Sequence, residues 1–322
     1  MRQIKLLVIT RPEAKYMSVL ETLPPGTTVV KGNSVHELSK DVVDADVILN
    51  DMNTGDVLRQ IFPLARKVQW VHSLSAGVES TLSPEITAST VPLTNARGVF
   101  KDSLAEWVIA AALFFAKDLR RLVHNQEAGI WKPFDIEMLG DQTMGVIGYG
   151  EIGRAAARRA HALGMRILAT RRRPELCHDD QIVERAFASA DRLQMIAECD
   201  YVVLATPRTS ATDKLIGPPE IAAMKPSAVL INVGRGNAID ENALAAALKE
   251  RRIRGAALDV FVDEPLPKDH PFWTLDNVLL SPHSADHTAD WLQRATRLFT
   301  TNFDRFANGE PLLNIVDKQA GY

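Results

Sequence analysis

Three glycines in the middle of the chain have the spacing of a phosphate-binding turn. Gly148, Gly150 and Gly153 follow an apolar run at 144–147 and open a segment, 151–163, that has helical spacing. In such a turn the first glycine permits the tight bend, the second lets a pyrophosphate approach the backbone, and the third lets the helix lie close to the strand. The helix N-terminus adds free N–H groups and the positive end of its dipole. The pattern predicts a dinucleotide site; a glycine turn in another kind of α/β unit is the alternative.

An arginine run stands where the type of nucleotide is decided. The next predicted strand, 165–170, would end in an acidic residue if it bound the ribose 2′-hydroxyl of NAD. Here Thr170 is followed by Arg171, Arg172 and Arg173. Guanidinium groups pair with a 2′-phosphate, which a carboxylate would repel. We therefore expect NADP(H) to be preferred, with NAD(H) possible, and Arg171 to be the main phosphate ligand, helped by Arg172 and the Thr170 hydroxyl. A solvated basic turn is the alternative.

Three polar residues follow predicted strands in the C-terminal half: Arg235, Glu264 and His283. Strands of one parallel sheet deliver their carboxyl ends to one edge, so these side chains can converge. A histidine can donate a proton to a carbonyl oxygen, and a nearby carboxylate favours the imidazolium form. An arginine can hold a substrate carboxylate and polarise a carbonyl. Beside a nucleotide site the set predicts hydride transfer to a ketone, although each residue alone is also compatible with a surface loop.

The elements that must position these residues alternate between strands and helices, which predicts parallel sheets with helices on their faces. Up to about residue 96, strands are expected at 4–10, 29–30, 47–49 and 68–74, and helices at 35–40 and 54–62. Further strands are expected at 144–147, 165–170, 201–206, 228–233, 256–260 and 278–280, and helices at 151–163, 191–197, 221–224, 241–250 and 289–308. We therefore predict an α/β protein with two doubly wound parallel sheets.

Two further segments have alternative interpretations. After the strand at 68–74, the backbone N–H groups of Ala76, Gly77 and Val78 can form a nest for a carboxylate, or simply belong to a strand-to-helix turn. Ser103 and Glu106 match a capping box that opens an apolar helix at 104–122. Because this helix is apolar nearly all round, we take it as the interdomain helix and part of a dimer contact; a helix in the core of one domain is the alternative.

Composition limits the possible partners. The chain has 322 residues, enough for two domains, and 46% of them are hydrophobic. A net charge of −3 gives no general attraction for nucleic acid or for an anionic membrane. Cys177 and Cys199 form neither a metal-ligand spacing nor a disulfide framework, and the apolar run at 4–10 is too short for a signal peptide. We expect a cytoplasmic protein without a metal site.

Four motifs make the chain resemble the D-isomer-specific 2-hydroxyacid dehydrogenases over nearly its whole length. They are GYGEIG at 148–153, INVGRGNAID at 231–240, GAALDVFVDEPLP at 255–267 and LSPH at 280–283. The resemblance implies a Rossmann-type NAD(P)-binding domain, at 98–285, inserted into a flavodoxin-like substrate domain, at 1–97 and 286–322. It also implies a homodimer that reduces small 2-oxo acids to D-2-hydroxy acids.

The resemblance also assigns roles. It makes His283 the acid/base, Glu264 its partner and Arg235 the substrate-binding arginine. Asp259 would face the nicotinamide carboxamide, and the backbone of Ala76, Gly77 and Val78 would hold the substrate carboxylate. Further cofactor contacts are expected from Gly148, Tyr149, Gly150, Glu151, Ile152, Gly153, Thr206, Pro207 and Val233.

The chain departs from the family pattern after the histidine. Many members have a glycine close behind it, whereas this chain continues with Ser284, Ala285, Asp286 and His287. The arginine run resembles the NADP-preferring branches. An NADPH-dependent reductase of glyoxylate, hydroxypyruvate or a similar acid is therefore the main hypothesis. A corepressor-like module that senses NAD(P) without significant turnover is the second, and phosphite or formate oxidation on a similar fold is the third.

Overall fold

A computed structural model describes residues 3–11 and 13–322. It divides into two compact units: a first unit of Met1–Phe100 with Thr288–Tyr322, and a second unit of Lys101–His287. Every strand pair within the two sheets is parallel, and each sheet changes direction in its strand order. The predicted α/β fold class with two doubly wound sheets is confirmed.

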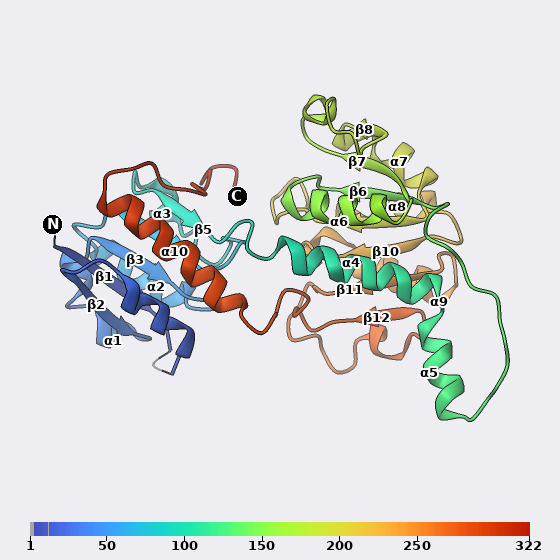
Figure 1. Ribbon diagram of the computed structural model, residues 1–322, viewed down its shortest axis with the longest axis horizontal. Coiled ribbons are helices and arrows are strands. Elements are labelled where there is room, and N and C mark those ends of the chain that lie inside the picture. The colour runs from blue at the N-terminus through green and yellow to red at the C-terminus, as the bar shows by residue number, and fades with distance from the viewer. Residues whose placement is uncertain (1–2, 12) are drawn as a thin grey trace. The chain divides into compact units, whose positions relative to one another are not determined.

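The described residues of the first unit contain a five-stranded sheet in the order β2-β1-β3-β4-β5 (Figure 1), which is the flavodoxin-like order. Its strands are β1 (Ile4–Ile9), β2 (Thr27–Gly32), β3 (Val47–Asn50), β4 (Trp70–Ser73) and β5 (Leu93–Asn95). Its helices are α1 (Val35–Leu38), α2 (Gly55–Ile61), α3 (Pro84–Ala88) and α10 (Trp291–Ala307).

Strand β4 shows how this sheet is covered on both faces. Successive side chains of a strand point to opposite faces. Trp70 and His72 face α10, where the indole ring stacks on Phe299 with a centroid separation of 5.2 Å. Val71 points the other way, into the cluster formed with α1, α2 and α3. The C-terminal helix α10 is thus part of the core of the first unit.

The second unit contains a seven-stranded sheet in the order β12-β11-β10-β9-β6-β7-β8 (Figure 1). Its strands are β6 (Thr143–Ile147), β7 (Arg166–Thr170), β8 (Arg185–Phe187), β9 (Tyr201–Leu204), β10 (Val229–Asn232), β11 (Gly255–Leu258) and β12 (Val278–Leu280). Its helices are α4 (Lys101–Ala116), α5 (Leu119–Glu127), α6 (Glu151–Ala162), α7 (Arg192–Glu198), α8 (Pro218–Ala223) and α9 (Glu241–Lys249). The order reverses at β6, so its carboxyl end is a topological switch point, where ligands bind in sheets of this type.

Right-handed crossovers in the two directions from β6 place helices on both faces of this sheet. Helix α4 packs on α6, while α7, α8 and α9 pack against one another in turn. The strands between them are almost entirely buried. Polar side chains are therefore found where the strands begin and where they end. We call these two sides of the sheet its amino edge and its carboxyl edge.

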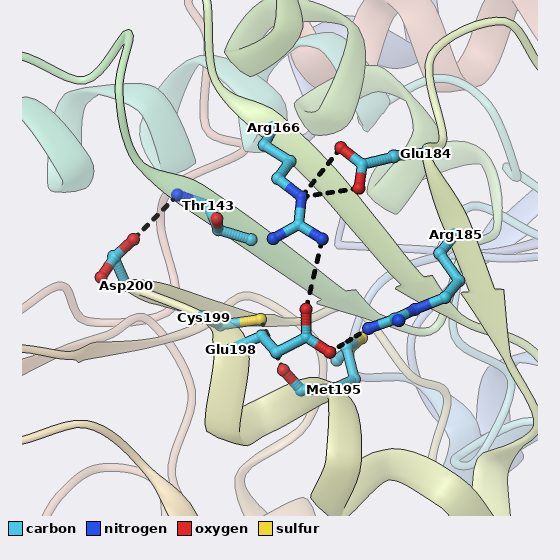
Figure 2. A network of polar contacts seen from close by, with 8 residues as sticks. All are labelled: Thr143, Arg166, Glu184, Arg185, Met195, Glu198, Cys199 and Asp200. Atoms are coloured by element: carbon cyan, nitrogen blue, oxygen red, sulfur yellow. Dashed lines mark hydrogen bonds and ion pairs between the residues drawn. The ribbon is translucent and has the colours of Figure 1, made fainter.

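At the amino edge, ion pairs join the starts of neighbouring strands (Figure 2). Arg166, the first residue of β7, donates to both carboxylate oxygens of Glu184 at 2.8 Å and to Glu198 at 3.2 Å. Arg185, the first residue of β8, pairs with the same Glu198. Partly exposed pairs of this kind contribute about 0–1 kcal/mol each. This edge is therefore occupied by structural contacts, unlike the carboxyl edge.

The predicted helix at 104–122 is wrong in two respects. Helix α4 begins at Lys101, so Ser103 lies inside it, and the Ser103 hydroxyl donates to the Ala285 carbonyl at 2.6 Å instead of capping the helix. The helical stretch is also broken, because Asp118 has a left-handed φ of +48° between α4 and α5. The apolar part, α4, packs on α6 and β10 within the second unit, which agrees with the core-helix alternative.

Candidate active site

The glycine turn joins β6 to α6, and its three glycines have different surroundings. Gly148 has φ +92°, and a Cβ there would lie 2.8 Å from the backbone of Ala205. A Cβ on Gly153 would lie 2.5 Å from the Gly148 carbonyl oxygen, so the helix can approach the strand only with a glycine there. At Gly150, by contrast, no atom of the described residues other than Gly150 and its two chain neighbours lies within 4 Å of such a Cβ. The turn leaves open space at the N-terminus of α6, as a pyrophosphate requires.

The end of β7 lies beside this turn. The Thr170 carbonyl accepts hydrogen bonds from the N–H groups of Gly148 and Tyr149, both at 3.3 Å. Thr170 is only 2% exposed, whereas Arg171 is half-buried and Arg172 is exposed. The arginine side chains, rather than the threonine hydroxyl, are therefore the groups that a phosphate can reach from solvent.

Thr206, just after β9, connects the glycine turn to the end of β10. A Cβ on Gly148 would lie 2.9 Å from the Thr206 methyl group, and a Cβ on Gly234 would lie 2.8 Å from the Thr206 carbonyl oxygen. The Thr206 hydroxyl is buried and has no hydrogen-bond partner among the described residues. A buried hydroxyl of this kind gains stability when a ligand satisfies it. Together with the space at Gly150, it fits a dinucleotide cofactor; Pro207 and Val233 follow the same two strands.

His283 and Glu264 form a hydrogen-bonded pair. His283 Nδ1 lies 2.7 Å from Glu264 Oε2, and Glu264 Oε1 accepts the Phe261 N–H at 2.9 Å. The hydrogen bond to Glu264 raises the pKa of His283 above its ordinary value, although burial acts to lower it. Burial acts to raise the pKa of Glu264, but hydrogen bonds from His283 and Phe261 bring it below its ordinary value. Both shifts favour the imidazolium–carboxylate state, in which Nε2 carries a transferable proton.

The backbone at His283 is strained and is held by Asp259. His283 has φ +51°, a left-handed conformation that costs a residue with a Cβ about 1–2 kcal/mol. Its N–H donates to the Asp259 carbonyl at 2.8 Å, and the N–H groups of Ser284 and Ala285 donate to Asp259 Oδ1 at 3.0 and 3.1 Å. Asp259 is 1% exposed. One of its oxygens thus anchors the histidine loop, and a contact to a nicotinamide carboxamide would use the other.

Arg235 begins the loop after β10, next to the segment that carries Glu264. A Cβ on Gly236 would overlap the backbone of Phe261, so the two loops are in direct backbone contact. The positive charge of Arg235 acts to lower the pKa of both His283 and Glu264, although the net shift of His283 is upward. The three residues predicted from strand ends therefore belong to one electrostatic environment.

The predicted carboxylate nest lies in the first unit, after β4. The Ala76 carbonyl accepts a hydrogen bond from the Asn95 side chain at 2.7 Å, which fixes the loop. Within the described residues of that unit, no acceptor takes the N–H groups of Ala76, Gly77 or Val78. The loop has the donors that an anion nest needs.

An additional acid follows the histidine, where the chain departs from the family pattern. Burial raises the pKa of Asp286, and its Oδ1 has no hydrogen-bond partner among the described residues. His287 Nε2 lies 3.7 Å from this oxygen. The departure therefore places a partly buried carboxylate three residues after His283.

Two contributions to the site were not predicted. Gly236 brings two loops together, and Asp259 anchors the histidine loop. A glycine directly after Arg235 was a visible signal, but its partner Phe261 lies in another loop and cannot be identified from one segment.

Other kinds of site find no support in the described residues. No group of three or more His, Cys, Asp or Glu side chains among residues 3–11 and 13–322 is arranged to hold a metal ion. In the same part of the chain, no helix combines the length and apolar character needed to cross a membrane.

The glycine turn, the switch point and the His–Glu pair define a nucleotide-dependent dehydrogenase of the Rossmann type. The sequence profile of the D-isomer specific 2-hydroxyacid dehydrogenase, NAD binding domain, matches residues 109–285. A glyoxylate reductase from Korarchaeum cryptofilum is 32% identical over 284 residues, covering 86% of this chain and 84% of that protein. A glyoxylate/hydroxypyruvate reductase B from Pectobacterium carotovorum is 34% identical over 272 residues, covering 82% of this chain and 84% of its own.

A solved structure of a similarly named enzyme has a similar fold. An NADPH-dependent glyoxylate/hydroxypyruvate reductase from Sinorhizobium meliloti, solved with NADP and sulfate, has a TM-score of 0.85 at 25% identity, covering 99% of this chain and 100% of that one. The chain therefore belongs to the D-isomer specific 2-hydroxyacid dehydrogenase family. It is an oxidoreductase that acts on 2-oxo and 2-hydroxy acids with a nicotinamide cofactor.

The His283–Glu264 pair predicts a measurable titration. In a Glu264→Gln variant the carboxylate that stabilises the imidazolium is lost, so the pKa of His283 falls. Long-range ¹H–¹⁵N NMR of the imidazole as a function of pH measures this change. Asp263→Asn is the matched control, because it removes a charge from an exposed neighbour on the same loop. An unchanged titration in Glu264→Gln would show that the pair does not form in solution.

Proposed function

We propose that this protein uses NADPH to reduce glyoxylate, hydroxypyruvate or a similar small 2-oxo acid to the D-2-hydroxy acid. The His283–Glu264 pair follows β11 and β12 of the sheet whose strand β6 leads into the nucleotide turn, and it is the observation that carries the proposal. The names of the K. cryptofilum and P. carotovorum relatives support the substrate class. The S. meliloti structure, which contains NADP, supports the cofactor.

The side chains of the second unit suit reduction of a ketone. NADPH, when bound, supplies the hydride for the carbonyl carbon. His283 Nε2 donates a proton to the carbonyl oxygen, so the C=O double bond becomes a C–O single bond with one new C–H and one new O–H bond, leaving NADP⁺ and a neutral imidazole. Glu264 holds the ring through Nδ1 and stabilises the charged form that precedes transfer. The Arg235 guanidinium polarises the carbonyl, and the N–H groups of Ala76–78 are the proposed ligands of the carboxylate.

A His283→Gln variant tests the acid/base role. Glutamine keeps a similar size but cannot donate a proton as imidazolium does, so turnover of glyoxylate and hydroxypyruvate falls by about 10²–10⁴-fold. Initial rates with each acid, with NADPH and with NADH, measure this loss. His287→Gln, four residues further on, is the matched control and retains most of the turnover.

Two outcomes of these assays would contradict the proposal. Full turnover in His283→Gln would remove the acid/base assignment. A wild-type protein inactive on all 2-oxo acids, but able to reduce NAD(P)⁺ with phosphite or formate, would change the substrate class. Absence of any turnover, with nucleotide binding retained, would favour a sensing module.

The cofactor preference depends on Arg171. Its backbone N–H donates to the Phe187 carbonyl of β8 at 3.1 Å, which fixes the start of the arginine run at the end of β7. Hydrogen bonds to a charged group contribute about 1.5–3 kcal/mol. An Arg171→Ala variant should therefore raise the KM for NADPH by about 10- to 100-fold and change the KM for NADH little.

The control for this variant is Arg185→Ala, which removes an arginine from the opposite edge of the same sheet. It should leave the ratio of the two KM values unchanged. If wild-type protein turned over faster with NADH, or if Arg171→Ala left the ratio unchanged, the arginine run would be only a solvated turn.

We also propose a homodimer, formed through an exposed apolar arm (Figure 1). The arm consists of α5 and residues 128–138, and no residue of α5 is buried. Its exposed apolar side chains are Leu119, Leu122, Val123, Ile130, Trp131, Ile136 and Met138, of which Trp131 is 98% exposed. Seven exposed apolar side chains within one segment of twenty residues favour an interaction site. A second copy of the chain presents the same arm, so a two-fold contact would cover both.

A Trp131→Glu variant tests the arm. A charge at the contact opposes burial, so the mass in solution should fall from twice 35.5 kDa to 35.5 kDa at micromolar concentration. Light scattering after size-exclusion chromatography measures the mass. Lys132→Glu, at an exposed neighbour outside the apolar set, should remain dimeric. A monomeric wild type, or a dimeric Trp131→Glu, would contradict the assignment.

A further inference from the structure

The loop that carries the arginine run closes back onto the glycine turn through one carboxylate. The Tyr149 hydroxyl donates to Asp180 Oδ2 at 3.1 Å, and Arg154 Nε lies 3.6 Å from the same oxygen. The other oxygen, Asp180 Oδ1, accepts the Ile182 N–H at 3.2 Å. Asp180 thus connects the turn and the first turn of α6 to a loop some thirty positions further along the chain.

This connection is largely shielded from solvent. Tyr149 is 2% exposed and the Asp180 side chain is 13% exposed. The Arg154 guanidinium lies over the Tyr149 ring, 5.6 Å from its centroid. Burial and the neighbouring Asp180 raise the pKa of Tyr149, so the phenol stays protonated and remains a hydrogen-bond donor. Cys177 is also buried, so the short 3-10 helix Pro174–Cys177 packs onto the unit.

The segment held in this way carries the groups that can bind a phosphate. Its start is fixed where the Arg171 N–H donates to the Phe187 carbonyl. Its end is fixed at Asp180, and the exposed Arg172 lies between the two attachments. Without the second attachment, the arginines would have to be ordered when the ligand binds, at a cost in conformational entropy.

We propose that Asp180 is a positioning residue for recognition of the cofactor 2′-phosphate. By joining Tyr149 and Arg154 to the loop, it holds the arginine run beside the glycine turn before the cofactor binds. This inference rests on the proposed NADPH preference and extends it to a residue that does not touch the phosphate.

The direction in which one substitution changes the affinity for the 2′-phosphate distinguishes this role from simple electrostatics. An acid close to a phosphate repels it, so if charge alone mattered, an Asp180→Asn variant would bind the 2′-phosphate more tightly and would also release Arg154 to pair with it. If Asp180 positions the loop, the same variant binds the 2′-phosphate more weakly. The direction of the change therefore decides between the two.

The test compares binding of adenosine 2′,5′-bisphosphate and adenosine 5′-monophosphate by calorimetry, in wild type and in Asp180→Asn. We expect the affinity for the bisphosphate to fall about tenfold, because the loop must now be ordered on binding, and the affinity for the monophosphate to change little. In steady-state assays the KM for NADPH rises by the same factor, with kcat at saturating NADPH retained. Asp179→Asn, which removes an exposed carboxylate one position earlier, should match wild type in both measurements.

A second variant isolates the hydrogen bond. Tyr149→Phe removes only the phenolic oxygen. It should also lower the affinity for the bisphosphate, by less than Asp180→Asn does. The ratio of the two affinities is measured on one preparation, so a partly unfolded sample does not alter it.

Different outcomes would contradict the cofactor preference and the positioning role of Asp180. A wild-type protein that does not prefer the bisphosphate would overturn the proposed cofactor preference itself. A wild type with that preference, together with an Asp180→Asn variant that keeps or strengthens it, would overturn only the positioning role.

Discussion

At the carboxyl edge of the second unit, backbone segments approach one another too closely for any side chain to stand between them. Gly148 lies against Ala205, Gly234 against Thr206, and Gly236 against Phe261. These contacts link the loops after β6, β9, β10 and β11 in sequence. Backbone moves less readily than a side-chain tip, so even one added methyl group at these positions would displace a loop. The nucleotide turn and the catalytic loops therefore depend on each other for their positions.

The charges at this edge act in opposite directions on His283, and their balance sets its pKa. Arg235 and burial act to lower the pKa of His283, while Glu264 acts to raise it. The 2.7 Å hydrogen bond to Glu264 is the largest single effect, and together with the negative charges of Glu264 and Asp259 it leaves the pKa of His283 above its ordinary value. Reduction needs the imidazolium, whereas oxidation of the hydroxy acid needs the neutral ring. In the proposed reductase, a raised pKa keeps His283 protonated near neutral pH, and we expect the rate of reduction to decline as pH rises through the raised value.

Features that depend on a few contiguous residues could be predicted from the sequence. The glycine turn was recognisable because its three glycines and their flanking elements are contiguous, and the convergence of Arg235, Glu264 and His283 followed from parallel strand direction alone. Both predictions depend on rules that need no knowledge of packing. The confirmed fold class has the same basis, since alternating strands and helices specify a parallel sheet wherever the side chains lie.

Features decided by distant contacts could not be predicted. The strands β5 and β8 have three residues each, and pairing with their neighbours selects them more than their own pattern does. The left-handed Asp118 ends a helix that its apolar sequence would continue. Tyr149 and Asp180 are 31 positions apart, and nothing in either segment specifies the other.

The proposed role of Asp180 illustrates how such contacts would affect specificity. An acid in a segment that follows three arginines would seem to oppose phosphate binding, since its charge subtracts from theirs. Its charge is already compensated, however, because Arg154 and the Tyr149 hydroxyl both face Oδ2 and the side chain is largely buried. The compensated carboxylate exerts little repulsion at a distance, while its hydrogen bonds still restrict the loop. Arginine count alone therefore does not determine how strongly a 2′-phosphate is selected; the order of the loop that presents the arginines contributes as well.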